Sequence, residues 1–461
     1  MSKENSNQTI IWDQALIQKY NYSGPRYTSY PTALEFNEQF TEHDFLDAAA
    51  LYPNKPLSLY IHIPFCHKLC YFCGCNKIVT RNHHKVATYL NALKHEIITR
   101  SKLFKTRTVT QMHWGGGTPT FLTNEEISWL IANLKQHFNF ADNAELSIEI
   151  DPREITTDTI AHLAKEGFNR LSMGIQDFNH EIQTLINREQ DENLIQALIE
   201  QAKANHFSSI SLDLIYGLPK QSVENFMQTL EKVIELGPDR LSIFNYAHLP
   251  DRFAAQRKIK DQDLPSAQEK VKILQNSIEY LTHHGYIFIG MDHFAKPTDE
   301  LAIAQKNGVL HRNFQGYATQ GDADLLGMGV SAISMIGDSY AQNQKDLKIY
   351  QDQVEQIGNA LWKGFTMSED DKIRRDVIKQ LICHFYLDKS VIEQHYHIDF
   401  DQYFAEDLLL LHPLQQDGLV EIDHKSIHVS AKGRLLIRNI CMCFDIYMRR
   451  VARQQQFSRV I

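Results

Sequence analysis

The sequence predicts an α/β protein built on a partial (β/α)6 barrel, with an N-terminal extension and a mostly helical, winged-helix-like C-terminal domain. Strand-like and helix-like stretches alternate from residue 57 to about residue 250, and polar residues cluster where the predicted strands end. From about residue 370 the chain changes to charged amphipathic helices. A repeated strand-then-helix order requires parallel strands joined by crossover helices. Six such units are fewer than the eight of a closed (β/α)8 barrel, so we expect an open one.

The composition is that of an ordinary soluble globular protein, and the length of 461 residues fits a large barrel plus an appended domain. The 47 basic and 56 acidic residues are well mixed and give a net charge of −9, so no electrostatic pattern suggests nucleic acid as a partner. Seven cysteines, four of them within residues 66–75, do not resemble a secreted disulfide framework. No apolar run is long enough to span a bilayer, and no signal peptide is evident. We expect a cytoplasmic monomer.

The six units follow from the apolar patterning of the chain. In order they are strand 57–63 with helix 84–101, strand 111–114 with helix 124–138, strand 145–151 with helix 157–166, strand 170–178 with helices across 180–206, strand 211–219 with helix 222–236, and strand 240–247. Functional residues of parallel α/β folds lie at the carboxyl ends of the strands. One cleft is therefore expected to collect the polar residues that follow these strands.

Three cysteines follow the first strand with the spacing C-x3-C-x2-C: Cys66, Cys70 and Cys73. Pro64 ends that strand, so the thiols are expected on a loop at its carboxyl end. Soft sulfur ligands favour zinc or iron–sulfur clusters, but structural zinc needs four ligands and no second cysteine pair of this kind exists in the chain. A [4Fe–4S] cluster on three cysteines would leave one iron open to a small molecule. Buried structural cysteines and a zinc knuckle are the alternatives, and Cys75 is too close to Cys73 to join the same cluster easily.

Other candidates follow the later strands. The triplet Gly115-Gly116-Gly117 lets backbone approach a ligand closely, although a plain tight turn explains it equally well. Glu149 ends the third strand and is placed to accept hydrogen bonds from a ribose, or is simply a solvated strand-end acid. Asp213 is costly to bury without a partner, and Arg188 is one possible partner. The histidines, His113 among them, show no metal-ligand spacing and are expected to be ordinary surface or core residues.

The two ends of the chain complete the expected organisation. We expect residues 1–50 to be an N-terminal extension covering the site, residues 51–365 the barrel with its extension, and residues 366–461 the C-terminal domain. Within the first segment, residues 20–31 cannot form a regular helix and are expected to lie extended against the main domain or to cover a site, with a solvated lead-in as the alternative. Residues 418–429 predict a strand–turn–strand wing, which is acidic and histidine-rich and so favours docking or covering over DNA binding.

In their order along the chain, the motifs resemble the oxygen-independent coproporphyrinogen III oxidases, a family of the radical S-adenosylmethionine (SAM) superfamily. The motifs that carry the resemblance are Pro25–Pro31, the C-x3-C-x2-C-x-C run, His113–Pro119, Gly174–Phe178, Asn313–Tyr317 and Arg438–Phe444. The resemblance extends from about Tyr20 to Ile461. It implies a radical-SAM barrel as the core of the fold.

The same resemblance implies a [4Fe–4S] cluster on Cys66, Cys70 and Cys73 and two bound SAM molecules. Carried over by motif, the residues contacting the cluster-bound SAM would be Tyr60, Gly116, Glu149 and Ile333. Those contacting the second SAM would be Phe72, Gly117, Thr118, Gln176, Arg188, Asp213 and Ala247. The catalytic candidates are Tyr60, Glu149, Phe314 and Gln315.

The implied activity is the oxidative decarboxylation of two propionate side chains of coproporphyrinogen III to vinyl groups, giving protoporphyrinogen IX for haem synthesis. A 5′-deoxyadenosyl radical from SAM would begin each reaction, and an electron donor and a terminal electron acceptor are the implied partners. One alternative is a haem-chaperone relative without oxidase activity, against which Cys75, Gln176-Asp177 and residues 26–30 argue. Another is a zinc-stabilised winged-helix regulator, which the acidic balance and the long α/β part disfavour.

Overall fold

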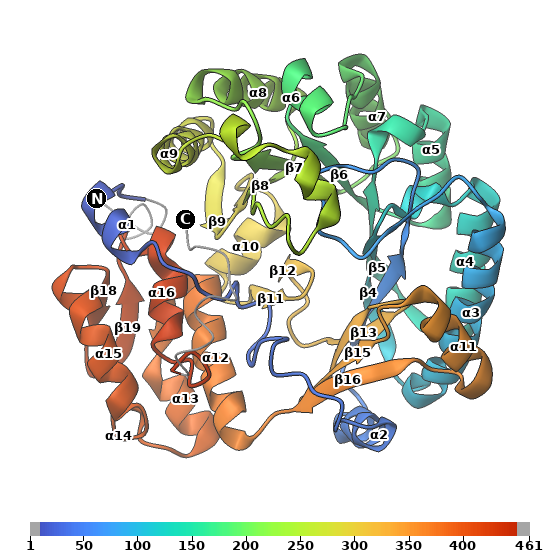
Figure 1. Ribbon diagram of the computed structural model, residues 1–461. Helices are drawn as coiled ribbons and strands as arrows, with labels where there is room; N and C mark the ends of the chain where they lie inside the picture. Colours follow the sequence, from blue (N-terminus) through green and yellow to red (C-terminus); the bar gives the residue numbers. More distant parts are fainter. Residues whose placement is uncertain (1–9, 450–461) are drawn as a thin grey trace. The chain divides into compact units, whose positions relative to one another are not determined.

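The computed structural model describes residues 10–449, which divide into two compact units (Figure 1). The barrel unit comprises residues 36–277 and 322–366. The helical unit comprises the other described residues, 10–35, 278–321 and 367–449. The expected domain boundaries after residues 50 and 365 stay a prediction about folding units.

The barrel unit alternates strands and helices through most of its length. Its elements are α2 (Glu42–Leu51), β1 (Leu57–Ile63), β2 (Phe65–Cys66), β3 (Ile78–Val79), α3 (His84–Ser101), β4 (Thr108–Gly116), α4 (Asn124–His137), β5 (Asn139–Ile150), α5 (Thr157–Glu166), β6 (Arg170–Gln176), α6 (His180–Leu185), α7 (Glu192–Ala204), β7 (Ser209–Tyr216), α8 (Val223–Leu236), β8 (Arg240–Asn245), β13 (Asp324–Met328), β14 (Ile333–Ile336), β15 (Ser339–Asn343), α11 (Leu347–Ile357) and β16 (Leu361–Thr366). Helix α9 (Ala267–His283) begins in this unit and ends in the helical unit.

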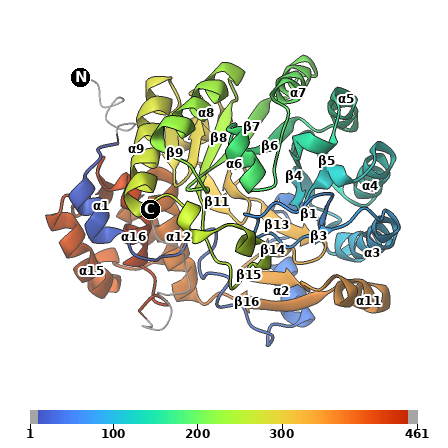
Figure 2. The same ribbon diagram turned by 45° about the horizontal axis from the view of Figure 1, so that its top comes forward.

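The sheet of the barrel unit has the strand order β16-β15-β14-β13-β1-β4-β5-β6-β7-β8. Neighbours from β1 to β8 are all parallel, and helices α3, α4, α5 and α7 line their outer side (Figures 1 and 2). This confirms the predicted partial (β/α)6 barrel. β13 adds a parallel strand beside β1, and the antiparallel strands β14 to β16 extend that edge.

Local sequence explains where these elements begin and end. In β1, Leu59, Ile61 and Ile63 are fully buried on one face, while Tyr60 on the other face is half-buried. Helix α4 begins with a capping box from Thr123, and α8 ends at Gly237, whose φ of 59° is the left-handed conformation that glycine adopts without strain. These signals are visible in the sequence, which is why the predicted helix bounds agree closely with the observed ones.

The helical unit contains short strands among its helices. Its elements are α1 (Gln14–Tyr20), β9 (Ile287–Gly290), β10 (His293–Ala295), α10 (Glu300–Lys306), β11 (His311–Asn313), β12 (Gly316–Ala318), α12 (Glu369–His384), β17 (Tyr386–Asp388), α13 (Lys389–Tyr396), α14 (Phe400–Tyr403), α15 (Ala405–Gln416), β18 (Val420–Ile422), β19 (Ser426–Val429) and α16 (Ile437–Met442). The predicted wing is confirmed as the antiparallel pair β18–β19, and β17 completes a three-stranded sheet on the other side of β19.

The N-terminal segment packs inside the helical unit. Arg26 forms an ion pair with Asp292 at 2.6 Å, and the Tyr27 hydroxyl donates to Asp445 at 3.0 Å. Any substrate carboxylate would therefore compete with Asp292 for Arg26. The covering role expected for this segment stays a prediction.

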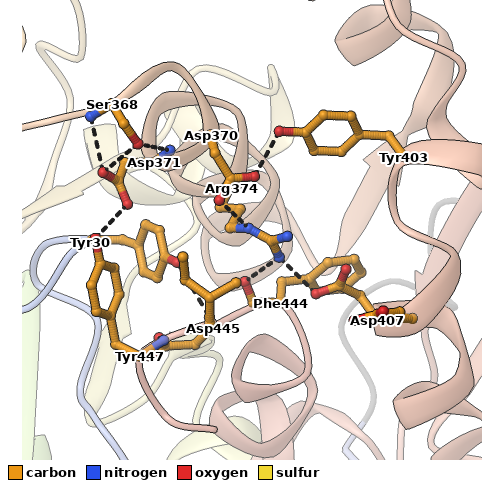
Figure 3. Close-up of polar contacts among 12 residues, drawn as sticks. Tyr30, Ser368, Asp370, Asp371, Arg374, Tyr403, Asp407, Phe444, Asp445 and Tyr447 are labelled. Atoms are coloured by element: carbon orange, nitrogen blue, oxygen red, sulfur yellow. Dashed lines mark hydrogen bonds and ion pairs between the residues drawn. The ribbon is translucent and has the colours of Figure 1, made fainter. Parts of the chain in front are cut away.

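A polar network links the C-terminal helices of the same unit (Figure 3). The Arg374 guanidinium donates to Asp407 at 2.6 Å and to the Phe444 carbonyl at 3.0 Å, while the Tyr447 hydroxyl donates to Asp371 at 2.9 Å. Asp407 and Arg374 are buried. Buried charges are tolerated when paired in this way, so the network fixes the end of the described chain against α12 and α15.

Candidate iron–sulfur and SAM site

The three predicted cluster cysteines lie on and just after the two-residue strand β2. Cys66 ends β2, which pairs in parallel with β3, and Cys70 and Cys73 follow on the loop between these strands. Cys66 and Cys70 are buried, Cys73 is half-buried and Cys75 is exposed. The return of the chain through β3 closes the loop on which all four cysteines lie.

Each of the three thiols accepts a hydrogen bond from the surrounding protein. Thr118 Oγ1 donates to Cys66 Sγ at 3.4 Å, and the Cys75 backbone N–H donates to Cys73 Sγ at 3.5 Å. Guanidinium N–H groups of two arginines donate to Cys70 Sγ. Hydrogen-bond donors around sulfur suit thiolates that hold an iron–sulfur cluster, so the donor set fits such a group. Within residues 10–449, no three or more His, Cys, Asp or Glu side chains gather closely enough to hold a single metal ion.

The thiols differ in their electrostatic surroundings. Burial raises the pKa of Cys66 to about 11. Hydrogen bonding from Cys75, together with the nearby Lys77 ammonium, lowers the pKa of Cys73 to about 6 against the opposing effect of burial. Cys73 is thus more readily deprotonated for metal binding than Cys66.

Neighbouring segments of the barrel unit hold the cysteine loop by hydrogen bonds and apolar packing. The Tyr71 backbone N–H donates to the Ile186 carbonyl at 3.0 Å. Phe72 packs on an apolar cluster that includes Ile186. The Gln256 amide donates to the carbonyls of both Phe72, at 3.0 Å, and Ala247, at 3.2 Å. Gln256 therefore brings together two residues predicted to contact the second SAM, although its position in the sequence gave no sign of this.

The glycine triplet meets the end of β1 at close range. A Cβ added to Gly117 would lie 2.7 Å from the Pro64 carbonyl oxygen, and one added to Gly116 would lie 2.8 Å from the His62 ring. Gly116 also has a φ of 119°, which side chains rarely tolerate. These close contacts with Pro64 and with the His62 ring of β1 give the two glycines a packing role in addition to any role in a turn.

Tyr60 and Glu149 both contact His113. The Tyr60 and His113 rings are stacked with centroids 6.0 Å apart, and His113 Nε2 lies 3.1 Å from Glu149 Oε1. His113 Nδ1 lies 2.6 Å from Ser147 Oγ, which fixes the ring from its other side. This role of His113 was not predicted from the sequence. The signal that could have found it is its position in β4, directly opposite Tyr60 in the register.

Gln176 and Arg188 converge on Gly174 of β6. A Cβ added to Gly174 would lie 2.6 Å from the Gln176 amide nitrogen and 3.0 Å from a guanidinium nitrogen of Arg188. Asp213 lies opposite Gly174 in the register of β6 and β7. Gln176 and Asp213, both predicted to contact the second SAM, therefore lie on two adjacent strands. Arg188, the third such residue, reaches Gly174 from the segment between α6 and α7. Gln176 has a φ of 70°, the kind of strained backbone found at functional sites.

Asp213 is half-buried and has no arginine partner. It accepts a hydrogen bond from Ser172 at 3.0 Å, whereas Arg188, suggested from the sequence as its partner, pairs with Asp151 at 3.3 Å. Burial, reinforced by the negative charge of Glu149, raises the pKa of Asp213 to about 6.

The remaining predicted residues lie farther along the chain. Ile333 begins β14, next to β13, whose Gly327 is opposite Tyr60 of β1. Phe314 and Gln315 form the turn between β11 and β12 of the helical unit. Their part in catalysis stays a prediction.

Family comparisons agree with this arrangement. The chain matches the model of the Radical SAM superfamily over residues 60–233 and that of the HemN C-terminal domain over residues 367–436. The three-cysteine loop at the end of β1 in a partial (β/α)6 barrel thus defines a radical SAM protein.

Individual relatives show which family of radical SAM proteins the chain resembles. The chain is 67% identical to the oxygen-independent coproporphyrinogen III oxidase of Escherichia coli (strain K12), over 99% of this chain and 100% of the relative. It is 49% identical to the protein of the same name from Pseudomonas aeruginosa, over 98% of this chain and 99% of the relative. The solved structure of coproporphyrinogen III oxidase (HemN) from Escherichia coli, a radical SAM enzyme, superimposes with a TM-score of 0.93 and 65% identity, covering 96% of this chain and 100% of that chain. The chain belongs to the family of oxygen-independent coproporphyrinogen III oxidases.

Within residues 10–449, none of the helices has the length and apolar character needed to cross a membrane.

Proposed function

We propose that this protein converts coproporphyrinogen III to protoporphyrinogen IX without oxygen, by oxidative decarboxylation of two propionate side chains to vinyl groups. The observation that carries the proposal is the hydrogen-bonded three-cysteine loop in a chain that matches a coproporphyrinogen III oxidase at 67% identity over 99% of its length. Each propionate loses one hydrogen atom, one further electron and CO2 as its two side-chain carbons become a vinyl group.

Residues of the barrel unit would hold the cofactors and position the substrate. Cys66, Cys70 and Cys73 would hold a [4Fe–4S] cluster. When bound, the cluster and SAM supply one-electron reduction of a sulfonium and hydrogen-atom abstraction from the propionate β-carbon. No general base is needed for that step, so the protein's contribution is positioning and exclusion of solvent.

We propose two SAM sites in the barrel unit. The first uses Tyr60, Gly116, Glu149 and Ile333. His113 supports this assignment, because it holds Glu149 and Tyr60 in fixed positions from which a carboxylate can accept ribose hydrogen bonds. Phe314 and Gln315 are proposed as further catalytic residues alongside Tyr60 and Glu149.

The second site uses Phe72, Gly117, Thr118, Gln176, Arg188, Asp213 and Ala247. The convergence of Gln176 and Arg188 on Gly174, and the link from Gln256 to Phe72 and Ala247, support this set. Binding of two SAM molecules would be measured as a stoichiometry of two by equilibrium dialysis, reduced to one in Asp213→Ala.

We propose that the protein is a monomer in the cytoplasm. A low-potential electron donor would reduce its cluster, and a terminal electron acceptor would take up the electron released from the substrate. Seven free cysteines suit a reducing compartment.

The decisive experiment is anaerobic reconstitution with iron and sulfide, followed by incubation with coproporphyrinogen III, SAM and dithionite. Vinyl product and 5′-deoxyadenosine are measured together by chromatography. The proposal expects both to form. A stable cluster and SAM cleavage without vinyl product would contradict it and favour the haem-chaperone alternative.

A further inference from the structure

Arg153 contacts the cysteine loop but belongs to neither proposed SAM site. It lies in the short 3-10 turn Pro152–Glu154 that follows β5, and its side chain is only 5% exposed. Its Nη2 donates to Cys70 Sγ at 3.3 Å, and its Nη1 donates to the Asn187 carbonyl at 3.1 Å. Asn187 in turn donates from its amide to the Leu69 carbonyl at 2.8 Å, which ties this group to the residue preceding Cys70.

Asp151 orients Arg153 toward the sulfur. The Asp151 carboxylate accepts from Arg153 Nε at 2.9 Å and from Nη2 at 2.6 Å. The same carboxylate pairs with Arg188, whose Nη1 also donates to Cys70 Sγ at 3.4 Å. Burial alone would raise the pKa of Asp151, but Arg188 and Arg153 outweigh it and lower the pKa to about 2. At neutral pH one carboxylate therefore holds two guanidinium cations against one sulfur.

This arrangement has a net positive charge next to a single ligand atom. An ion pair with Asp151 needs two of the guanidinium N–H groups and does not require contact with sulfur. Arg153 Nη2 nevertheless donates to both Asp151 Oδ2 and Cys70 Sγ. Hydrogen bonds and positive charge at the ligand sulfurs of an iron–sulfur cluster stabilise its reduced state, which carries one more negative charge.

We propose that Arg153 is a positioning residue that acts through Cys70 to raise the reduction potential of the cluster. The inference rests on the proposed function. The half-reaction adds one electron from a low-potential one-electron donor and changes no bond and no proton. Arg153 thereby eases electron entry, which must precede SAM cleavage, without contacting SAM itself.

The test is a potentiometric titration of the reconstituted cluster in the absence of SAM, with dithionite and mediators, followed by electron paramagnetic resonance. Arg153→Met keeps much of the side-chain volume but removes the charge and the donors. We expect the oxidised-to-reduced ratio at a fixed potential to rise about tenfold, a fall in midpoint potential of about 59 mV for a one-electron couple. Arg153→Lys keeps the charge without the planar fork, so a smaller fall is expected.

Arg100→Met is the matched control. Arg100 is also buried and forms a two-point pair with a carboxylate, Glu42, at 2.5 and 3.1 Å, but it packs on the Phe45 ring rather than on a cysteine. This variant should lose stability with an unchanged midpoint potential.

The outcomes separate the two proposals. If the parent protein yields no [4Fe–4S] spectrum, the proposed function fails. If the parent cluster forms and Arg153→Met retains it with an unchanged midpoint potential, the inference about Arg153 is wrong. If Arg153→Met does not retain the cluster, Arg153→Lys decides: a lower potential supports the inference and an unchanged one overturns it. An equal shift in Arg100→Met would also overturn it, since the effect would then be general to buried arginines.

Discussion

At the scale of single residues, the four cysteines of the loop differ in exposure and in hydrogen bonding. Cys66 and Cys70 are buried and accept from side chains, whereas the exposed Cys75 contributes its backbone N–H to Cys73. A residue whose backbone supports a ligand does not itself need to be a ligand. Cys75 is therefore expected to be replaceable without loss of the cluster.

The first prediction tests this assignment. Cys66→Ser, Cys70→Ser and Cys73→Ser should each lose the [4Fe–4S] cluster, because a hydroxyl is a poor substitute for a thiolate on iron. Cys75→Ser should keep it, since the backbone donor to Cys73 remains. Iron and labile sulfide content, with the visible absorption spectrum, provide the measurement. Retention of a full cluster in any of the first three variants would contradict the ligand set.

The second prediction concerns Asp213 and pH. Its pKa is about 6 in the folded protein against an ordinary value of 3.8, so the folded state binds more protons between these values. Stability should therefore fall as pH rises from about 4 to about 6. Asp213→Asn removes this cost and should stabilise the cluster-free protein at neutral pH by up to about 3 kcal/mol.

Thermal unfolding of the parent and Asp213→Asn at pH 4 and pH 7.5 provides the measurement. The difference in midpoint should be larger at pH 7.5, where Asp213 of the parent is ionised and partly desolvated. Asp239→Asn is the control, because Asp239 immediately precedes β8 and its carboxylate accepts from the Ile210 backbone N–H at 3.0 Å. A difference between the parent and Asp213→Asn that does not change with pH would count against the raised pKa.

At the scale of elements, the approach of β4 to the loop after β1 determines how the cysteines are held. The Gly117 backbone N–H donates to the Ile63 carbonyl at 2.8 Å, which closes the space that a side chain would need. The next residue, Thr118, then reaches Cys66. A change in β4 is thus transmitted directly to a cluster ligand.

The third prediction follows from this contact. Gly117→Ala should destabilise the barrel unit by about 2 kcal/mol, because its Cβ would meet backbone atoms of Pro64 at 2.7 Å that cannot rotate away. The cysteine loop would shift, and reconstitution should give less than half of the parent's cluster content.

Gly285→Ala is the control for that variant. Gly285 has a φ of 85° with nothing within 4 Å of an added Cβ, so alanine there incurs only backbone strain of about 1 kcal/mol. Its cluster content should equal the parent's. Equal cluster loss in both variants would show that general destabilisation, rather than the contact with Pro64, is responsible.

Much of the barrel could be predicted because its signals are local. The bounds of α3 and α5 agree with the predicted 84–101 and 157–166, since apolar periodicity is encoded within each helix and α5 also ends at Gly167 in the left-handed conformation. The strands β13 to β16 were not predicted from the sequence. β13 pairs with β1 from more than 250 residues away, and strands this short show little apolar alternation by which to recognise them.

The sequence indicated which residue types belong to the candidate site, but not which side chains contact one another there. The cysteine spacing and the glycine triplet indicated the chemistry, and the structure places Tyr60 and Glu149 on the strands expected. Which side chains hold these residues could not be predicted. The roles of His113 and Arg153 depend on strand register and on the path of the chain after β5, and single-sequence patterns specify neither.

At the scale of the whole molecule, the N-terminal segment is built into the helical unit by buried polar contacts. Beyond the pairs of Arg26 and Tyr27, the Arg438 guanidinium donates to the Pro25 carbonyl at 2.8 Å, and the Asn439 amide donates to the Tyr20 carbonyl at 2.9 Å. These contacts join residues about 400 positions apart. The segment therefore contributes to the stability of the helical unit whether or not it also covers the substrate.

The fourth prediction separates anchoring from covering. Deleting residues 1–35 should abolish vinyl formation while the cluster is retained, because the cysteines and their hydrogen-bond donors all belong to the barrel unit. The helical unit should become less stable, since Asp292 and Asp445 lose the partners that Arg26 and Tyr27 provide.

Tyr27→Phe removes only one anchoring hydrogen bond and should lower the free energy of unfolding by about 1 kcal/mol with vinyl formation preserved. Chromatography of vinyl product and 5′-deoxyadenosine, with thermal unfolding of each variant, provides the measurements. If the protein lacking residues 1–35 forms vinyl product at the parent rate, the segment only anchors and the covering hypothesis is wrong.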